Sequence, residues 1–315
     1  MRTRNAGPVA VGTALVISVG TAVAAVGGVV PLRASVSQQH FAPPVSAAPQ
    51  TAVPTHPGTV QHLVQPAPDA AAGRRHIWVY RPAVPDSATL PVLYFLHGLP
   101  GSADDLADQV DLAHALDQAF MSGALAPFVV AAPDGNSLGA NDPEWADSVK
   151  GHVKLETFVT GPLIEAVEGA NRRDARHRAI AGFSMGGYGA VTLALKHPEL
   201  FGQVASLAGY FHVDDPSHVF GRRPDLEAAN SPDRHAAEFG GLRVFLADGA
   251  QDTEPTLKGE TRRFAALLAT AGHPAAVSLP QGGHTWAFVK AEMPLVEDFL
   301  EQGWAPKPAW DHPDL

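Results

Sequence analysis

A serine flanked by glycines constrains the fold of this chain more than any other feature. The stretch reads Gly182-Phe183-Ser184-Met185-Gly186, with a short apolar run before it and a segment able to form a helix after it. A Gly-x-Ser-x-Gly pattern at a strand-to-helix turn is a nucleophile elbow, which holds the serine hydroxyl at the edge of a sheet. Glycines fit on both sides because side chains there would collide with neighbouring backbone. The pattern predicts that Ser184 is a nucleophile.

The motif needs its context, because a glycine-rich chain of this length contains it by chance at a rate on the order of one in ten. A serine after a glycine is also an ordinary helix cap. The strand-like run before Gly182 and the small-residue segment after Gly186 provide the strand–turn–helix context that an elbow requires.

Composition describes an ordinary globular chain. Its 315 residues are 45% hydrophobic and 17% charged, which is ample material for a core. The formal charge of −10, without a basic stripe, makes nucleic acid an unexpected partner. The absence of cysteine excludes disulfides and thiolate chemistry but not export, since large domains are stable without disulfides.

Residues 1–33 have the features of an export segment. Arg2 and Arg4 precede an uncharged stretch over residues 9–32, and Ala22-Val23-Ala24 offers a small-x-small cleavage site. A cleaved signal peptide and an uncleaved membrane anchor both fit this pattern. In either case the two arginines favour keeping the N-terminus on the cytoplasmic side of the membrane. We therefore expect a secreted or cell-envelope protein, either released or membrane-tethered, with its folded part outside the cytoplasm.

Three further segments follow the export segment. A proline- and alanine-rich linker is predicted over residues 34–57, because prolines alternate there with Ala, Ser, Gln and Val and no helical or strand period is present. One domain is predicted over residues 58–304, a length typical of a single α/β unit. The proline-containing residues 305–315 are expected to form a loose tail.

Strand and helix patterns alternate through this domain, which predicts a mainly parallel sheet with helices on both faces. Together with the elbow, this predicts the α/β-hydrolase fold. Strands are expected at residues 59–65, 75–81, 91–96, 127–132, 179–181, 203–207, 242–247 and 275–279. Helices are expected at residues 103–120, 157–168, 187–195, 260–271 and 286–300. Active sites of such sheets lie at the carboxyl ends of the strands.

The base that would activate Ser184 is sought among the histidines downstream of it. A serine hydroxyl is a poor nucleophile until a base accepts its proton, and in this fold the order is serine, acid, histidine. His284 follows the last predicted strand, and Gly282 and Gly283 allow its loop to bend over the sheet edge. His273 precedes a strand and His312 lies in the tail, so His284 is the predicted base.

The acid is expected after the strand at residues 242–247, where two aspartates compete. Asp248 comes directly at the strand end, where it could instead order the loop through backbone hydrogen bonds. Asp252 lies further out, where it can reach the ring of His284. We favour Asp252, keep Asp248 as the alternative, and place Glu254 third.

An oxyanion hole needs backbone N–H donors from two places. One is the residue after the nucleophile, Met185, and the other comes from the loop His97-Gly98-Leu99, with Leu99 as the expected donor. His97 lies upstream of the serine and is expected to shape this loop rather than to act as the base.

The motifs together resemble the esterase D-type family, which includes S-formylglutathione hydrolases, feruloyl and acetylxylan esterases, and the antigen 85 mycolyltransferases. The resemblance spans roughly residues 58–302 and rests on residues 94–101, 133–135, 144–145, 182–189, 197–201, 248–252 and 283–286. It implies a nucleophile, an acid, a base and two oxyanion donors at Ser184, Asp252, His284, Leu99 and Met185.

These features predict an exported serine esterase acting on a small-molecule, polysaccharide or lipid ester. The mycolyltransferases differ after the nucleophile and use a glutamate as their acid, so Met185-Gly186-Gly187 and Asp252 favour hydrolysis. The export segment disfavours formylglutathione, the substrate of cytosolic relatives. A cell-envelope acyltransferase using the same triad is the first alternative, and a non-catalytic binding module is the second.

Remaining candidates concern the substrate pocket and metals. Trp145, Tyr210 and Phe211 are low-weight candidates for lining a pocket, since large aromatic side chains more often serve packing. The run His212-Val213-Asp214-Asp215 has ligand-type side chains, but no second cluster supports it, so neither a metal nor another cofactor is expected. The sequence predicts no particular oligomeric state.

Overall fold

The computed structural model describes residues 52–305 apart from residues 71, 86, 138–141, 214, 216 and 255–256, together with the backbone of Leu15–Val16 and Ser37–Gln38. Apart from those four residues, the predicted export segment, the linker up to residue 51 and the tail after residue 305 therefore lie outside the described residues. Among the described residues, no helix combines the length and the apolar character that crossing a membrane requires.

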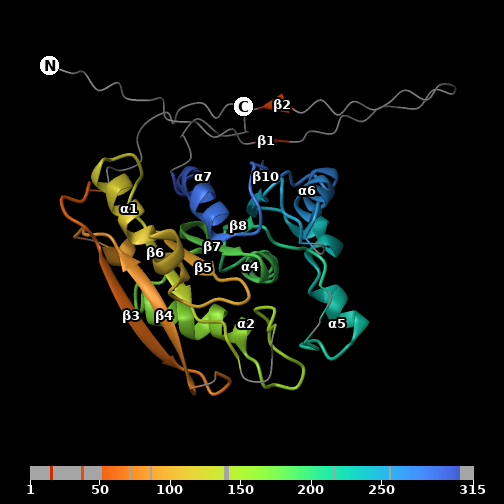
Figure 1. Ribbon diagram of the computed structural model, residues 1–315. Coiled ribbons are helices and arrows are strands. Elements are labelled where there is room, and N and C mark those ends of the chain that lie inside the picture. Colours follow the sequence, from red (N-terminus) through yellow and green to blue (C-terminus); the bar gives the residue numbers. More distant parts are fainter. Residues whose placement is uncertain are drawn as a thin grey trace, which may run out of the picture.

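A single twisted sheet runs through the centre of the molecule (Figure 1). Its strand order is β2-β1-β10-β9-β8-β7-β5-β6-β4-β3, and β6, β5, β7, β8, β9 and β10 are parallel. The hairpin of β3 and β4 is antiparallel and forms one edge, while the two-residue strands β1 and β2 lie beyond β10. The bounds are β1 Leu15–Val16, β2 Ser37–Gln38, β3 Thr59–Pro66, β4 Arg74–Arg81, β5 Val92–Leu96, β6 Val129–Pro133, β7 Arg178–Phe183, β8 Gln203–Leu207, β9 Arg243–Ala247 and β10 Ala276–Ser278.

The central strands are apolar on both faces because both faces are covered. Along β5, Val92, Tyr94 and Leu96 enter one core cluster, whereas Leu93 and Phe95 enter another. Successive side chains of a strand point to opposite faces, so this alternation divides the core into two layers. A parallel sheet enclosed in this way is expected to consist of nearly continuous apolar strands.

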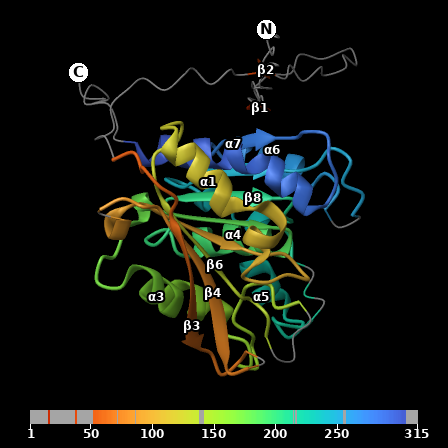
Figure 2. The same ribbon diagram turned by 60° about the vertical axis from the view of Figure 1, so that its left-hand side comes forward.

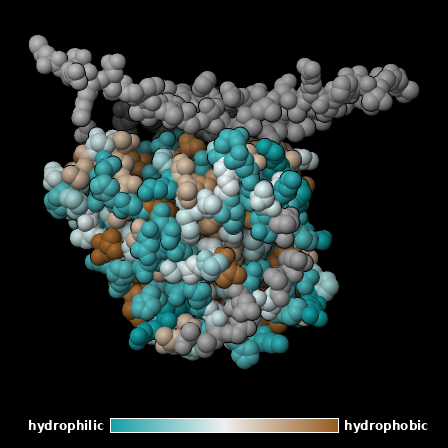
Figure 3. All heavy atoms as spheres, in the orientation of Figure 1, coloured by the Kyte–Doolittle hydropathy of each residue, from teal (hydrophilic) through white to brown (hydrophobic). Residues whose placement is uncertain are grey.

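Different helices cover the two faces (Figure 2). The first layer packs against η3, α3, α4 and α6, and the second packs against η2, α1 and α7. Over the face shown in Figure 3, hydrophobic residues are interspersed with hydrophilic ones, as expected when helices turn their apolar sides inward. The bounds are η1 Ser87–Thr89, η2 Leu106–Val110, α1 Leu112–Met121, α2 Leu155–Phe158, η3 Val159–Leu163, α3 Ile164–Glu168, η4 Ala175–His177, α4 Met185–Lys196, α5 Pro224–Ala229, η5 Pro232–Arg234, η6 Ala236–Glu238, α6 Glu260–Thr270 and α7 Trp286–Trp304.

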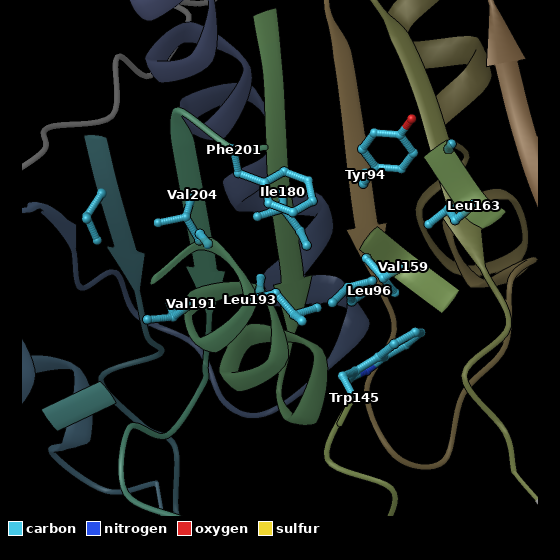
Figure 4. Close-up of a cluster of buried hydrophobic side chains, with 14 of the residues drawn as sticks. Tyr94, Leu96, Trp145, Val159, Leu163, Ile180, Val191, Leu193, Phe201 and Val204 are labelled. Atoms are coloured by element: carbon cyan, nitrogen blue, oxygen red, sulfur yellow. The ribbon is translucent and has the colours of Figure 1, made fainter. Parts of the chain in front are cut away.

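Close packing under the sheet fixes the position of α4, the helix that follows the predicted elbow. In Figure 4, Val191 and Leu193 of α4 lie beneath Ile180 of β7 and Val204 of β8. All four side chains are at most 1% exposed. Burying an aliphatic side chain contributes about 1.5–3 kcal/mol, so this contact holds α4 firmly against the strands that precede and follow it.

The predicted α/β-hydrolase fold is confirmed, but two predicted helices are wrong in detail. Residues 103–120 do not form one helix, because Asp111 adopts a left-handed backbone with φ 58° between η2 and α1. Residues 157–168 include the wide-turned segment η3, which carries Pro162. Proline cannot donate the backbone hydrogen bond that a regular α-helix requires.

A buried ion pair joins α3 to the start of β7. Arg178 donates hydrogen bonds to both carboxylate oxygens of Glu168, each at 2.8 Å, and Tyr94 donates to the same carboxylate at 2.9 Å. Arg178 also donates to the carbonyl of Leu200 at 2.8 Å. Burial alone would raise the pKa of Glu168, but the hydrogen bonds and charge of Arg178 hold it below its usual value. The pair therefore ties the strand that precedes Ser184 to its neighbours.

Replacing Arg178 with methionine should lower the free energy of unfolding by about 3–5 kcal/mol, because Glu168 would be left as an unpaired buried charge. The double variant Arg178→Met/Glu168→Leu should recover part of this loss, since the carboxylate that lost its partner is then removed, while the buried Arg173 beside it remains charged. Urea unfolding at neutral pH measures both. A single-variant loss below about 1 kcal/mol would show that the pair is not a buried anchor.

Candidate active site

Ser184 lies at the sharp turn between β7 and α4, where its backbone has φ 57° and ψ −120°. This is an unusual conformation for a residue other than glycine, and such outliers cluster at functional sites. A hydrogen bond of 2.9 Å from its amide to the carbonyl of Leu207 fixes the turn to β8. The strained turn places the serine side chain beyond the carboxyl ends of the parallel strands.

The glycines around Ser184 are required by the close approach of β5. A Cβ on Gly186 would lie 2.0 Å from the carbonyl oxygen of Leu96, and a Cβ on Gly182 would lie 2.2 Å from that of Gly186. Both distances are far below van der Waals contact. The predicted collision of side chains at these two positions with neighbouring backbone is therefore present at this elbow.

Ser184, His284 and Asp252 form one continuous hydrogen-bonded chain. His284 Nε2 is 2.9 Å from Ser184 Oγ, and His284 Nδ1 is 2.9 Å from Asp252 Oδ2. The Asp252 carboxylate can only accept, so the ring proton of His284 is on Nδ1. Nε2 is then unprotonated and accepts a hydrogen bond from the serine hydroxyl. These three side chains come from the loops after β7, β9 and β10.

The two aspartates after β9 occupy different positions. Asp252 Oδ2 faces His284, while Asp252 Oδ1 accepts from the amide of Glu254 at 2.9 Å. The Asp252 side chain is 1% exposed. Asp248 is also buried but makes no hydrogen bond to His284, and Glu254 contributes only its amide. The geometry therefore pairs His284 with Asp252 rather than with Asp248.

The other downstream histidines lie away from this chain. His273 Nε2 lies 3.2 Å from the carbonyl of Ala237, at the exposed surface. His312 lies outside the described residues.

The two predicted oxyanion donors come from two segments that meet at Ser184. Met185 is the first residue of α4, where a helix leaves its backbone N–H groups without intrahelical acceptors. The loop bearing Leu99 touches the elbow, since a Cβ on Gly98 would lie 3.1 Å from Ser184 Cβ. The amide of Ser184 itself is occupied by Leu207 and cannot serve as a donor.

His97 sets the orientation of the peptide that carries the Leu99 amide. The amide of Gly135 donates to His97 Nε2 at 2.8 Å, so the ring proton is on Nδ1, which lies 2.7 Å from the carbonyl oxygen of Gly98. In a trans peptide the C=O and N–H groups point in opposite directions. Holding the Gly98 carbonyl against His97 therefore turns the Leu99 N–H away from the His97 ring.

Arg75 is a buried residue near the site that the sequence did not single out. Its side chain is fully buried and donates to the carbonyls of Asp134 and Asn136 at 3.1 and 2.8 Å. It also donates to Ser137 Oγ at 2.7 Å and to Asp69 Oδ2 at 2.6 Å. These contacts fix the loop after β6, whose Gly135 amide holds His97. In the sequence Arg75 is one polar residue of a strand, and only the fold shows that it points inward.

The structure corrects two of the three predicted pocket residues. Trp145 and Phe211 are 1% and 0% exposed, so neither lines a surface pocket. Trp145 donates to the carbonyl of His97 at 3.1 Å and packs beyond the end of β5 (Figure 4), while Phe211 stacks on Phe264. Both residues support the loops around the site.

Tyr210 is partly exposed and has a polar partner that the sequence did not reveal. Its hydroxyl donates to Glu144 Oε2, and its ring stacks on Tyr188 with centroids 4.7 Å apart. Burial, followed by the charge of Glu144, raises the pKa of Tyr210 well above its usual value, so the hydroxyl stays a donor. Glu144 has a left-handed backbone with φ 56°.

The polar run at residues 212–215 is divided between separate contacts. His212 Nδ1 lies 3.3 Å from Asp233 Oδ1, and Asp215 accepts from the amide of Phe220 at 3.1 Å. Asp214 lies outside the described residues. Within the described part of the chain, no three His, Cys, Asp or Glu side chains come together as metal ligands would.

Comparison with known families decides where the chain belongs. The family model described as "Putative esterase" matches residues 69–297, which is most of the chain. The chain belongs to this esterase family. The predicted resemblance is thereby confirmed at the level of the family.

One curated relative is the "Putative esterase NocK" of Nocardia uniformis subsp. tsuyamanensis, which is 30% identical over 192 residues. The match covers 59% of this chain and 53% of NocK. The chain thus spans about half the length of this relative.

Solved structures share the fold at low sequence identity. A ferulic acid esterase superimposes with a TM-score of 0.67 at 22% identity, covering 79% of this chain and 99% of that protein. An S-formylglutathione hydrolase from Staphylococcus aureus gives a TM-score of 0.61 at 17% identity, covering 77% and 98%. At such identities the likeness establishes the α/β-hydrolase fold alone.

A single methyl group at Gly186 should disrupt the elbow, because no space exists between it and the Leu96 carbonyl. We expect Gly186→Ala to lower the free energy of unfolding by about 3 kcal/mol or more. Gly161→Ala is the matched control, since nothing lies within 4 Å of its Cβ. Chemical unfolding measures both variants, and equal stability of the two would contradict the crowding argument.

Proposed function

We propose that the chain is a serine esterase that hydrolyses carboxylic esters through an acyl intermediate on Ser184. The observation that carries this proposal is the Ser184–His284–Asp252 hydrogen-bonded chain, with both contacts at 2.9 Å. A nucleophile bonded to a base that a carboxylate orients is the arrangement that acyl transfer requires. Membership of the esterase family supports the same reaction class.

In the acylation step, Ser184 Oγ attacks the ester carbonyl carbon while its proton moves to His284 Nε2. The ring then carries a positive charge, which the carboxylate of Asp252 at Nδ1 stabilises without taking the proton. His284 next donates the proton from Nε2 to the leaving alcohol oxygen as the carbonyl–oxygen bond breaks. The acyl group remains on Ser184 as an ester.

The amides of Leu99 and Met185 hold the negative oxygen of the tetrahedral intermediate. Two observations support this role: His97 orients the Leu99 amide, and Met185 begins α4 with a free backbone N–H. The positive end of the α4 dipole adds to the same field. Preorganised donors of this kind contribute about 2.7–4 kcal/mol each to transition-state stabilisation.

Deacylation repeats these steps with water as the nucleophile. His284 removes a proton from water as the water oxygen attacks the acyl-Ser184 carbonyl carbon. The bond between that carbon and Ser184 Oγ then breaks, His284 returns the proton to Oγ, and the carboxylic acid leaves. An alcohol in place of water would make the same residues an acyltransferase. The run Met185-Gly186-Gly187 and an aspartate as the acid favour water, so hydrolysis is the proposed reaction.

The proposed setting is outside the cytoplasm, because Arg2 and Arg4 precede an apolar run typical of export segments. Esters of small molecules or polysaccharides are the proposed substrates, since ferulic acid esterase is among the structural neighbours.

Replacing Ser184 with alanine should reduce hydrolysis of a short p-nitrophenyl ester by about 10⁴-fold or more, because no other hydroxyl occupies the position bonded to His284. Ser122→Ala is the matched control: this serine is exposed, its hydroxyl donates to the carbonyl of Ala119, and its variant should keep full activity. Initial rates at saturating ester measure both. Substantial hydrolysis by the Ser184 variant would refute the proposed nucleophile.

Across the range from acidic to slightly alkaline pH, hydrolysis should rise with pH, because a histidine base accepts a proton only when its ring is neutral. The rise should appear in kcat/KM, which reports on the free enzyme. A rate profile of a neutral ester across this range tests the expectation. A flat profile would mean that no histidine acts as the base.

A further inference from the structure

A second carboxylate, Asp248, lies on the same loop as Asp252 and lines a cavity with it. Asp248 follows β9 and is 6% exposed, and its Oδ1 has no hydrogen-bond partner among the described residues. The cavity has a volume of about 380 Å³ and is lined by both aspartates, by Lys258 and Arg262, and by Leu279. Neither Ser184 nor His284 is among its lining residues.

A buried carboxylate with an unsatisfied oxygen destabilises a fold, and such groups are retained where they serve a function. Burial, followed by the charge of Asp252, raises the pKa of Asp248 to about 6. At neutral pH Asp248 is therefore ionised at a cost to stability. An apolar or amide side chain in the same place would avoid that cost.

We propose that Asp248 is a positioning residue of this site, whose negative charge acts through Asp252 to favour the protonated His284 ring that forms during catalysis. The inference rests on the proposed esterase mechanism. The amide of Asp252 donates to the carbonyl of Gly249 at 2.8 Å, which closes one turn and keeps the two carboxylates on the same loop. Asp252 has both oxygens engaged, by His284 and by the amide of Glu254, so it cannot turn away from the added charge.

The charges around Asp248 leave its negative charge only partly offset. Two cations line the cavity: Arg262 of α6, and Lys258, which lies two residues before that helix begins. Both are exposed, so solvent screens their charges. Glu260 of the same helix is paired with Arg263. From β10, the carbonyl of Ser278 accepts the Asp248 amide.

On the α7 side, Glu292 bonds Ser278, and burial raises the pKa of Glu292. The nearest fixed charge is thus Asp252 itself, and beyond it the imidazole of His284.

The test is the pH profile of kcat/KM for Asp248→Asn. Loss of the negative charge should make the His284 ring easier to deprotonate, so the acid limb should move to lower pH by about half a unit. The plateau kcat should fall about threefold, because the protonated ring is less stabilised in the transition state, while KM changes less. Asp248→Glu restores the charge, and the cavity gives room for the extra methylene, so the limb should return towards that of the unaltered protein.

Asp225→Asn is the matched control, because Asp225 pairs with Arg223 at the exposed surface and should leave the profile unchanged. Thermal unfolding at about pH 8 separates a positioning role from a merely structural one. Asp248→Asn should be at least as stable as the unaltered protein there, because a carboxyl whose folded pKa is raised weakens the fold as pH increases.

An Asp248→Asn profile that superimposes on that of the unaltered protein would overturn the inference, as would a fall in activity matched by a fall in unfolding temperature. Failure of the proposed function is a different result. In that case the unaltered protein would show no acid limb, or Ser184→Ala would remain active.

Discussion

The close approach of the β5 backbone to the first turn of α4 is the constraint on which the site depends. The carbonyl of Leu96 sits where a side chain on Gly186 would have to be, so β5, β7 and α4 can meet only through glycine. That contact forces the left-handed turn at Ser184 and lifts its hydroxyl beyond the sheet edge. It also brings the Gly98 loop against the serine, which places both proposed oxyanion donors beside one atom.

Buried polar networks extend this constraint to loops far apart in the chain. Arg75 of β4 holds the loop after β6, that loop holds His97, and His97 fixes the Gly98–Leu99 peptide. On the other side, the loops after β9 and β10 meet through Asp252 and His284. The elbow supplies the nucleophile, and these networks position the oxyanion donor of the Leu99 loop and the His284 ring that would act with it. Asp248 adds a second buried carboxylate to the loop that carries the acid.

The sequence predicted the features that local chemistry encodes. Glycine spacing marked the elbow, apolar runs marked the buried strands, and chain order after the serine selected Asp252 and His284. The sequence did not predict the features that depend on long-range packing. Asp111 interrupts a segment whose periodicity reads as one helix, and the inward orientation of Arg75 follows from the pairing of β4 with β6. Trp145 and Phe211 were low-weight pocket candidates, because aromatic residues suit both pockets and cores, and burial decides between the two.

The central claim is that Ser184 is activated by its hydrogen-bonded partners. Its most direct test is to treat the folded protein with a fluorophosphonate probe and to identify the modified residue by peptide mass spectrometry. The account predicts one phosphonylated residue, Ser184, with labelling that is greatly slowed in His284→Ala. Labelling at another residue, no labelling of the folded protein, or an unchanged labelling rate in the His284 variant would contradict it.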